Sequence, residues 1–363
     1  MKKLLNFTLK WPAVIFAGVL IITALFFVAN KKFGYMETDL DKYMPQKHPA
    51  FVYSNKAEEW FNIKDAIIIA IENKDGIYNS SVFTKIKSIT RELQKMKEIK
   101  RDDVTSLYTV DNIVGVDGGI EVESIFTKVP AEQKVYDSIQ KNIRNNEMIF
   151  GKLVSYDETV SVIVTELEDG VFNENFYKNI LKLEEKYSGP EKIYIAGKPI
   201  IEGTMANYAK KDMRKMIPII SLLIFFLLLI IYRSFKNTIL TLLVVIFSSL
   251  WVFGLMALMR IPVYAISTMM PVMLIAIGVA YGIHMYNHLK LFLLKNPDAK
   301  KKEAVLDMFN EMWKPVLMTA ITTAIGFVSL ITSQVYPIKY FGIFTALGVM
   351  AAMFFSLFFI PAG

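Results

Sequence analysis

The stretch MIPIISLLIFFLLLIIY, residues 216–232, holds 17 consecutive residues without a charge. A helix of roughly 20 residues crosses the hydrocarbon core of a bilayer, and a run this apolar is typical of such a helix. Five further runs are of the same kind. They are Trp11–Val28 near the start of the chain and Asn237–Met259, Pro262–Asn287, Pro315–Ser333 and Tyr340–Ile360 in its second half. We therefore expect an α-helical membrane protein with six transmembrane helices.

These apolar runs are unevenly spaced, because a long polar segment separates the first from the second. The sequence predicts three parts: residues 1–29 as a cytoplasmic N-terminus and first transmembrane helix, residues 30–215 as an external domain, and residues 216–363 as a five-helix transmembrane block. The first run is 18 residues long, and no small-x-small cleavage site follows it. It is longer than the apolar region of about 7–15 residues in a signal peptide, so we interpret it as an uncleaved anchor.

The positive charges of the short connections predict the orientation. Eleven basic residues lie on one side of the predicted membrane: Lys2, Lys3, Lys10, Arg233, Lys236, Lys290, Lys295, Lys300, Lys301, Lys302 and Lys314. Only Arg260 and Lys339 lie in the short loops opposite. Short basic loops stay in the cytoplasm. We expect a multi-pass protein of the plasma (inner) membrane with both termini cytoplasmic and residues 30–215 on the external or periplasmic side.

The composition excludes several classes of function. The chain has no cysteine, which excludes disulfides and thiolate metal sites. The net charge of +7 arises in the membrane part, since residues 30–215 hold 28 Lys and Arg against 30 Asp and Glu. The basic balance therefore reports membrane topology and gives no reason to expect nucleic acid. No nucleophile–base pair or metal-ligand set is visible, so we expect neither an enzyme nor a cofactor.

The external domain shows the pattern strand, helix, strand twice. The predicted elements are Ala66–Ile71, Ser80–Glu98 and Val104–Val110 in the first block, and Thr159–Leu167, Phe172–Tyr187 and Ile193–Ala196 in the second. Between the blocks, Asn112–Glu123 is rich in Gly and Asp and predicts a loop, and Ala131–Met148 predicts a helix. Two such units indicate a split βαβ, porter-like α+β fold. From Ile200 the pattern is helical into the second span.

The fourth span contains the most polar segment of any apolar run, GVAYGIH at residues 278–284. Gly278 and Gly282 are four residues apart and allow close helix packing. Tyr281 and His284 are three apart and are expected on one face. Two interpretations stay open: a relay of protons or substrate through His284, or two interfacial anchors near the cytoplasmic boundary. His288 follows His284 at a metal-capable spacing, but no third ligand is near, so no metal is predicted.

Small and hydroxyl residues recur along the fifth span. Thr319, Thr322, Thr323 and Gly326 predict close helix packing first and the lining of a transport path second. Before this span, a short helix with one apolar face is expected to rest on the inner leaflet, with Asp298 as its N-cap. That face comprises Val305, Met308, Phe309, Met312 and Trp313.

Together, the order of one span, a domain and five spans, the segment AGKP at residues 196–199 before a helix, and IAIGVAYGIH at residues 275–284 resemble the resistance-nodulation-division (RND) superfamily. The likeness is greatest to its MMPL-type exporters, whose five-span block resembles a sterol-sensing domain. That family usually has Gly-x-Asp-Tyr or Gly-x-x-x-Asp-Tyr in the fourth span, where the Asp carries protons. Here the Tyr matches Tyr281, and Ala280 occupies the Asp position.

The resemblance implies half of a transporter that exports hydrophobic or amphiphilic molecules, driven by an ion gradient whose acidic carrier lies outside this chain. The expected partners are a lipid or amphiphilic substrate and a second six-helix half, fused or separate, or a further copy in a homo-oligomer. Tyr281, His284, Thr319, Thr322 and Thr323 are the candidate transport residues. A lipid-sensing receptor or scaffold of sterol-sensing type, or a Sec-type accessory translocation subunit, is the alternative.

Overall fold

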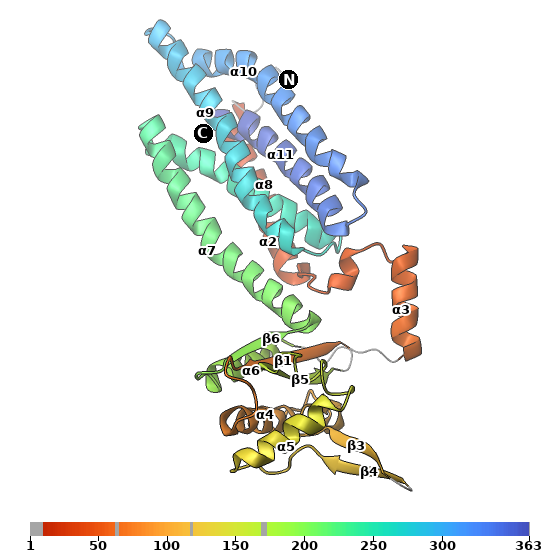
Figure 1. The fold of residues 1–363 in the computed structure, drawn as a ribbon. Coiled ribbons are helices and arrows are strands. Elements are labelled where there is room, and N and C mark those ends of the chain that lie inside the picture. Colours follow the sequence, from red (N-terminus) through yellow and green to blue (C-terminus); the bar gives the residue numbers. More distant parts are fainter. Residues whose placement is uncertain (1–9, 62–64, 117–118, 168–172, 363) are drawn as a thin grey trace. The chain divides into compact units, whose positions relative to one another are not determined.

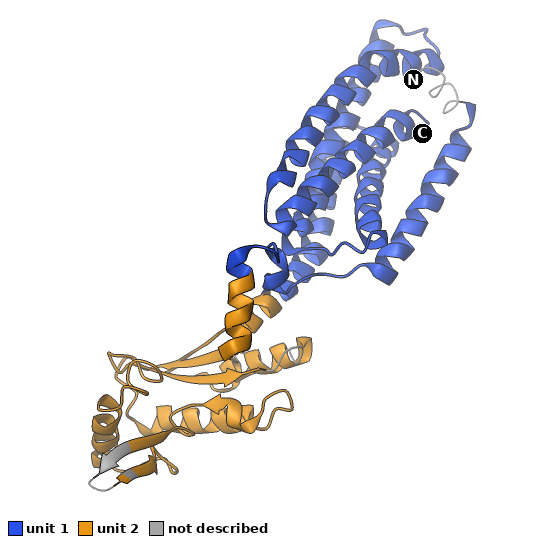
Figure 2. Ribbon diagram, turned by 90° about the vertical axis from the view of Figure 1, so that its right-hand side faces the viewer, with its two compact units in different colours: residues 1–51, 205–363 blue, residues 52–204 orange. Residues whose placement is uncertain are grey.

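A computed structural model describes residues 10–61, 65–116, 119–167 and 173–362. It divides into two compact units, shown in Figure 2. The membrane unit comprises residues 1–51 and 205–363, and the external unit comprises residues 52–204. Contacts within the chain therefore group residues 30–51 and 205–215 with the membrane helices.

The structure confirms six helices that are long and apolar enough to cross a membrane. They are α2 (Pro12–Phe33), α7 (Lys198–Tyr232), α8 (Phe235–Leu258), α9 (Met270–Lys295), α10 (Lys301–Val328) and α11 (Tyr336–Ala362). The 3₁₀ helix η3 (Ala265–Met269) precedes α9, and η4 (Ser329–Thr332) follows α10. The predicted helix from Ile200 into the second span is confirmed as part of α7.

Local chemistry places the ends of these helices. Ser234 caps α8 through its side-chain oxygen, which accepts a hydrogen bond from the backbone N–H of Asn237 at 3.5 Å. Arg233 immediately before this cap has φ +51°, and Arg260 after α8 has φ +56°. These two left-handed residues reverse the chain in short connections, which keeps successive helices antiparallel. Pro12 begins α2, where its missing N–H is not needed.

The predicted short helix before the fifth span is the first part of α10 and packs against the bundle. Met308 and Phe309 of its predicted apolar face are buried among the membrane helices, so this part of the face packs on protein, and the position of the helix on the inner leaflet stays a prediction. The Phe309 ring lies 6.2 Å from that of Phe358 on α11. In Figure 1 the first turns of α10 cross the end of the bundle before the helix descends along it. Pro315 lies inside the helix.

Asp298 was expected to be the N-cap of that helix, and this prediction is wrong. The N-cap is Lys300, whose backbone N–H donates to the Glu303 carboxylate at 3.3 Å. Asp298 lies instead in the turn that connects α9 to α10, where the N–H of Ala299 donates to the carbonyl of Asn296. The backbone N–H of Glu303 in turn donates to the Lys300 carbonyl at 2.9 Å, so the reciprocal pair of Lys300 and Glu303 begins the helix two residues after Asp298.

The external unit confirms the split βαβ fold. Its four-stranded antiparallel sheet has the order β2-β5-β1-β6. The strands are β1 (Ala66–Glu72), β2 (Val104–Thr105), β5 (Val160–Glu166) and β6 (Lys192–Ala196). Helix α4 (Ser80–Leu93) connects β1 to β2, and α6 (Glu174–Lys186) connects β5 to β6. Each pair of strands is separated by one strand of the other pair, which defines the split arrangement.

Alternation along the strands explains which face of this sheet is covered. Ile67, Ile69 and Ile71 of β1 are fully buried, whereas Ile68 is 39% exposed on the other face. The buried stripe of α4 packs into the same core and comprises Val82, Phe83, Ile86, Ile89 and Leu93. Helix α5 (Gln133–Arg144) adds Tyr136, Ile139 and Ile143. A single hydrophobic core therefore joins both βαβ units.

Three predicted elements of this unit differ in the structure. Asn112–Glu123 is no loop but a hairpin of β3 (Asp111–Val116) and β4 (Gly119–Ser124), whose residues 117–118 lie outside the described part. The predicted strand Val104–Val110 stops after Thr105, because the Thr109 hydroxyl donates to the carbonyl of Val104 and closes a turn. Helix α4 ends at Leu93 rather than Glu98.

Three short elements complete the described chain. They are η1 (Leu40–Tyr43), α3 (Pro49–Phe61) and η2 (Arg101–Asp103).

Candidate functional site

Helix α9 lies close to α8 at its two glycines. A Cβ atom built at Gly278 would lie 2.9 Å from Val245 Cγ2, and one at Gly282 would lie 2.6 Å from Thr241 Cγ2. Only a residue without a side chain fits at this distance. The two glycines thus fix the approach of α9 to α8, with Tyr281 between them in sequence.

The other side of this segment packs on α11. A Cβ at Gly348 of α11 would lie 2.6 Å from Leu274 Cδ1, and one at Gly278 would lie 3.5 Å from the Cβ of Ala352. Both contacts join residues 74 positions apart, so α9 and α11 run in the same direction and in constant register. Four residues further along both helices, the same register places Ser356 of α11 at the level of Gly282, next to Tyr281 in the sequence of α9.

Tyr281 is buried, with 3% of its surface exposed, and its hydroxyl has no hydrogen-bond partner in the described part of the chain. The hydroxyl of Ser356, also fully buried, has none either. An unsatisfied buried hydroxyl costs about 1–3 kcal/mol, and such groups call for a water, a ligand or a functional explanation. By this register, the hydroxyl-bearing residues Tyr281 and Ser356 lie at the same height along the α9–α11 contact. We therefore treat this part of the contact as a candidate polar site inside the bundle.

Ala280 and His284 lie on the exposed side of α9. Ala276, Ala280 and His284 are all exposed and follow one another every four residues, so they form one strip along the helix. This outer strip of α9 contains the position that the family usually gives to the acid. Tyr281 is buried and His284 is exposed, so the edge of the packed face passes between these two side chains, although they are only about 60° apart around the helix.

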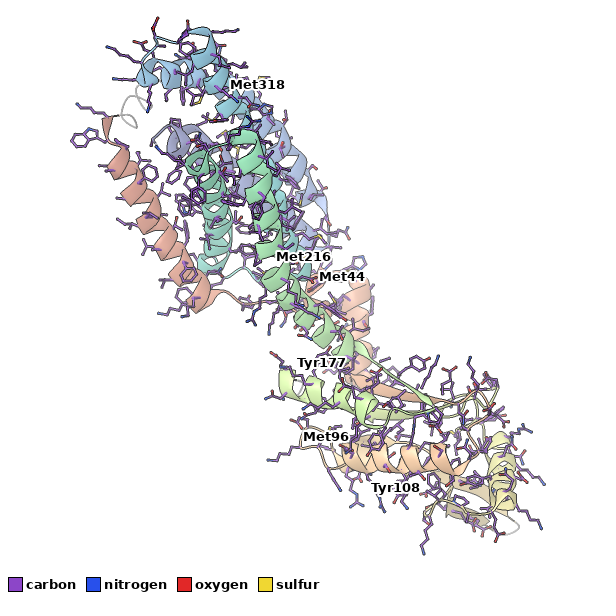
Figure 3. All side chains as sticks on the ribbon, turned by 90° about the vertical axis from the view of Figure 1, so that its left-hand side faces the viewer. Met44, Met96, Tyr108, Tyr177, Met216 and Met318 are labelled. Carbon is purple, nitrogen blue, oxygen red and sulfur yellow. The ribbon has the colours of Figure 1, made fainter. Side chains whose placement is uncertain are left out.

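The small and hydroxyl residues of α10 also lie mainly outside the packed bundle. Thr319 and Thr322 are exposed and donate to their own helix, to the carbonyls of Pro315 at 2.9 Å and Met318 at 3.0 Å. Nothing lies within 4 Å of a Cβ built at Gly326, and Thr323 is half-buried. Met318, labelled in Figure 3, is 68% exposed. Within the described chain, this face has no helix packed on it at Gly326.

One polar pair in this region was not anticipated from the sequence. His288 Nε2 lies 3.0 Å from a carboxylate oxygen of Asp307, which joins the end of α9 to the first part of α10. The signal was present, since both residues fall on predicted helices, but their pairing depends on how α10 folds back on α9. His288 is thus engaged with Asp307 one turn beyond His284.

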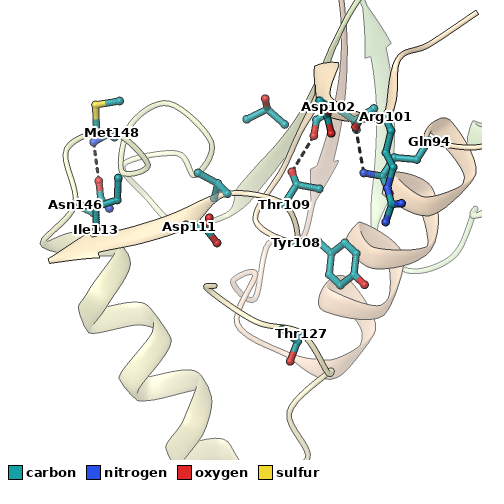
Figure 4. Close-up of a pocket in the computed structure, with 13 residues that line it drawn as sticks. Gln94, Arg101, Asp102, Tyr108, Thr109, Asp111, Ile113, Thr127, Asn146 and Met148 are labelled. Atoms are coloured by element: carbon teal, nitrogen blue, oxygen red, sulfur yellow. Dashed lines mark hydrogen bonds between the residues drawn. The ribbon is translucent and has the colours of Figure 1, made fainter. Parts of the chain in front are cut away.

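The external unit has a hollow of about 690 Å³ beside β2 and the β3–β4 hairpin (Figure 4). Gln94, Arg101 and Asp102 line its polar side, and Ile113 and Met148 line its apolar side. Ile113 and Met148 are 63% and 73% exposed. A hollow with both kinds of wall can accept an amphiphilic molecule or a segment of another chain. The sequence did not predict this hollow, because residues 112–123 were interpreted as a loop and not as the hairpin that borders it.

Tyr108 borders the same hollow and is held by cationic neighbours. Its hydroxyl accepts a hydrogen bond from Arg91 at 2.9 Å, and the ammonium of Lys87 lies 5.2 Å from its ring centre. Tyr177, also labelled in Figure 3, lies elsewhere in this unit, on α6, where its hydroxyl is 2.9 Å from that of Thr204. The polar contacts of the unit hold aromatic side chains in place, and no arrangement of a nucleophile with a base accompanies them in the described residues.

Six apolar helices, with a split βαβ unit between the first and the second, define a multi-pass membrane protein of transporter type. The sequence profile of the MMPL family matches residues 79–362, which covers most of both units. The chain belongs to the MMPL family, whose members are RND-type membrane transporters and not enzymes. The predicted resemblance is confirmed.

One relative is a protein of Methanocaldococcus jannaschii, MJ1562, described by name only as a membrane protein. It is 24% identical over 372 residues, an alignment that covers 100% of this chain and 92% of the relative.

Proposed function

We propose that this chain is one half of an RND-type exporter of hydrophobic or amphiphilic molecules, driven by an ion gradient. The observation that carries the proposal is the exposed strip of α9, where Ala280 occupies the usual carboxylate position. An acid on a second half could face this strip. His284 lies one turn further along the strip and is the titratable neighbour of such an acid.

The partner is a second six-helix half, fused or separate, or a further copy of this chain. The exposed face of α10 around Thr319, Thr322 and Gly326 supports this, because small residues on lipid-exposed helices are suited to close packing with another helix. In this assembly the external unit is the porter that handles substrate, and its hollow beside β3 and β4 is the candidate contact with the cargo.

Orientation follows from the charge of the connections. The basic loops hold both termini and the α9–α10 connection in the cytoplasm, and the external unit faces outward. The exposed apolar residues of its hollow then meet substrate after it has left the membrane.

A transport assay tests the assignment of roles. Wild-type protein in vesicles with a pH gradient should move a fluorescent amphiphile in an ion-dependent manner. His284→Ala should retain at least about a third of this rate, because a neighbour that tunes an acid contributes less than the carrier itself. Loss of all proton-dependent transport in folded His284→Ala protein would make His284 the carrier and remove the partner acid. A monodisperse monomer that transports would contradict the paired assembly.

Ala280 also favours a second candidate, a lipid sensor of sterol-sensing type, because such a protein needs no proton carboxylate. The two differ in one measurement. A sensor binds its lipid with no vectorial movement, whereas an exporter accumulates it on one side of the vesicle. Binding without movement, in protein assembled with its partner half, would favour the sensor.

A further inference from the structure

One cavity in the membrane unit belongs to neither the α9 strip nor the external hollow. It has a volume of about 380 Å³ and lies at the end of the bundle where α8 and α10 begin and α11 ends. This volume is in the range of sites for small molecules, about 300–1,000 Å³. All its lining residues belong to the membrane unit.

The walls of the cavity divide by chemistry. One part is apolar and comprises Leu240, Leu289, Leu293, Val305 and Met308. The other part is polar, with the buried Tyr232 and, nearby, Tyr286 and Asn237. Tyr232 accepts a hydrogen bond from Thr241 at 3.3 Å and keeps its own hydroxyl hydrogen for a further acceptor. A molecule that fills this space needs an apolar chain and a polar end that accepts hydrogen bonds.

The positive charge beside the cavity favours a ligand whose polar end is negatively charged. Lys236 in the first turn of α8 and Lys301 at the first residue of α10 both line the cavity, and no Asp or Glu is among its lining residues. In the described chain, neither lysine forms an ion pair. Both are exposed, so their ammonium groups remain hydrated in the absence of an anion. The positive ends of two helix dipoles add to the lysine charges.

We propose that this cavity binds an anionic phospholipid, with the phosphate between Lys236 and Lys301 and an acyl chain along Leu240, Leu289 and Leu293. Basic pockets between helices at the membrane surface bind anionic headgroups in this way. The lipid is a ligand of the membrane unit in its own leaflet. Its binding needs no proton carrier, no partner half and no transport, so it is independent of the proposed function.

The test measures retained lipid by native mass spectrometry. Delipidated full-length protein is exposed to equal amounts of phosphatidylglycerol and phosphatidylethanolamine. Wild type should retain phosphatidylglycerol in preference, and Lys236→Gln and Lys301→Gln should each lower its retention about fivefold. The double variant Lys290→Gln/Lys295→Gln is the matched control, since it removes two positive charges from the end of α9 outside the cavity. A loss in this control as large as that in Lys236→Gln and Lys301→Gln, or no preference in wild type, would overturn the proposal.

A second variant separates the lipid from free anions. Leu293→Trp fills the apolar wall without changing the charge, and it should also lose phosphatidylglycerol. Millimolar inorganic phosphate or glycerol phosphate should not displace the lipid, because neither has an acyl chain. Displacement by inorganic phosphate, with Leu293→Trp unaffected, would show an anion site and contradict a lipid site. Circular dichroism and size-exclusion chromatography check that each variant is folded. We expect folded protein, because the substituted lysines are exposed and the leucine is partly exposed.

Discussion

Gly282 is among the most tightly enclosed positions of α9. A side chain there would meet Thr241 and, at 3.1 Å, the hydroxyl of Tyr232. Both lie on helices that are themselves packed, so neither can move away without cost. Gly326 of α10 is its opposite, since a Cβ there meets nothing within 4 Å.

This contrast gives a prediction at the residue scale. Gly282→Val should destabilise the protein by about 1–3 kcal/mol through overpacking, and more where the helices separate. Gly326→Val should leave the stability of a single, unassembled chain within about 0.5 kcal/mol, since a Cβ at this position meets nothing within 4 Å in the described chain. Thermal unfolding in detergent, followed by circular dichroism, compares the two. Equal melting temperatures would mean that α9 does not approach α8 this closely.

The sequence alone shows that Ala280 occupies the position of the family's usual Asp, but it does not show which way Ala280 faces. The spacing between Gly278 and Tyr281 aligns with the family motif, so the missing acid is apparent from residue order alone. Which side of α9 is covered depends on where α8 and α11 lie. Spacing places Tyr281 and His284 on neighbouring positions of the helix, whereas only the structure shows that Tyr281 is buried and His284 is exposed.

Among the elements, the turn before β5 shows how a charged residue joins two parts of the external unit. Glu158 has φ +59° and is 9% exposed, and its carboxylate accepts two hydrogen bonds from Arg144 at 2.6 Å. Gln140 donates a third at 2.6 Å. The Arg144 guanidinium holds the pKa of Glu158 below its ordinary value, against the opposing effect of burial.

The stability of this unit should therefore depend on pH. A carboxylate with a lowered pKa in the folded state contributes stability above its ordinary pKa and loses it as the pH falls through the lowered value. Glu158→Gln should cost about 1–3 kcal/mol near neutral pH and flatten the dependence in acid. Hydrogen exchange of the β5 amides in the full chain measures both effects. Protection in wild type that is unchanged between neutral and acidic pH would contradict this role.

Two elements escaped prediction for identifiable reasons. The hairpin β3–β4 is rich in Gly and Asp, residues that usually indicate loops, and its pairing of Ile113 with Val122 leaves both side chains exposed. No buried alternation was available to reveal it. Pro315 was predicted to begin a span, but α10 begins at Lys301 and continues through Pro315. A proline inside a helix removes one backbone hydrogen bond and usually indicates a helix end, which is why the sequence pattern placed the boundary there. By contrast, β1 was predictable because it is a continuous apolar run with Ile67, Ile69 and Ile71 fully buried, and β5 because Val160, Val162 and Val164 recur at every second position, although these valines are only half-buried.

For the whole molecule, the absence of cysteine permits a direct test of orientation. Lys74→Cys in the external unit should react with an impermeant thiol reagent added to intact cells, whereas Lys301→Cys at the start of α10 should react only after the cells are permeabilised. Both positions are exposed, so access depends on the side of the membrane. Labelling of Lys301→Cys in intact cells would reverse the orientation predicted from the basic loops.

The seam between α9 and α11 has a further consequence for motion. Leu274 lies against Gly348 and Gly278 against Ala352, so the surface repeats every four residues along both helices. Four helical residues rise about 6 Å. A displacement along the seam would drive Leu274 out of its glycine notch, and one turn on it would meet Ala352, whose Cβ occupies the space that Gly348 leaves open. Sliding along this seam is therefore opposed, and α9 and α11 are expected to move together as one body.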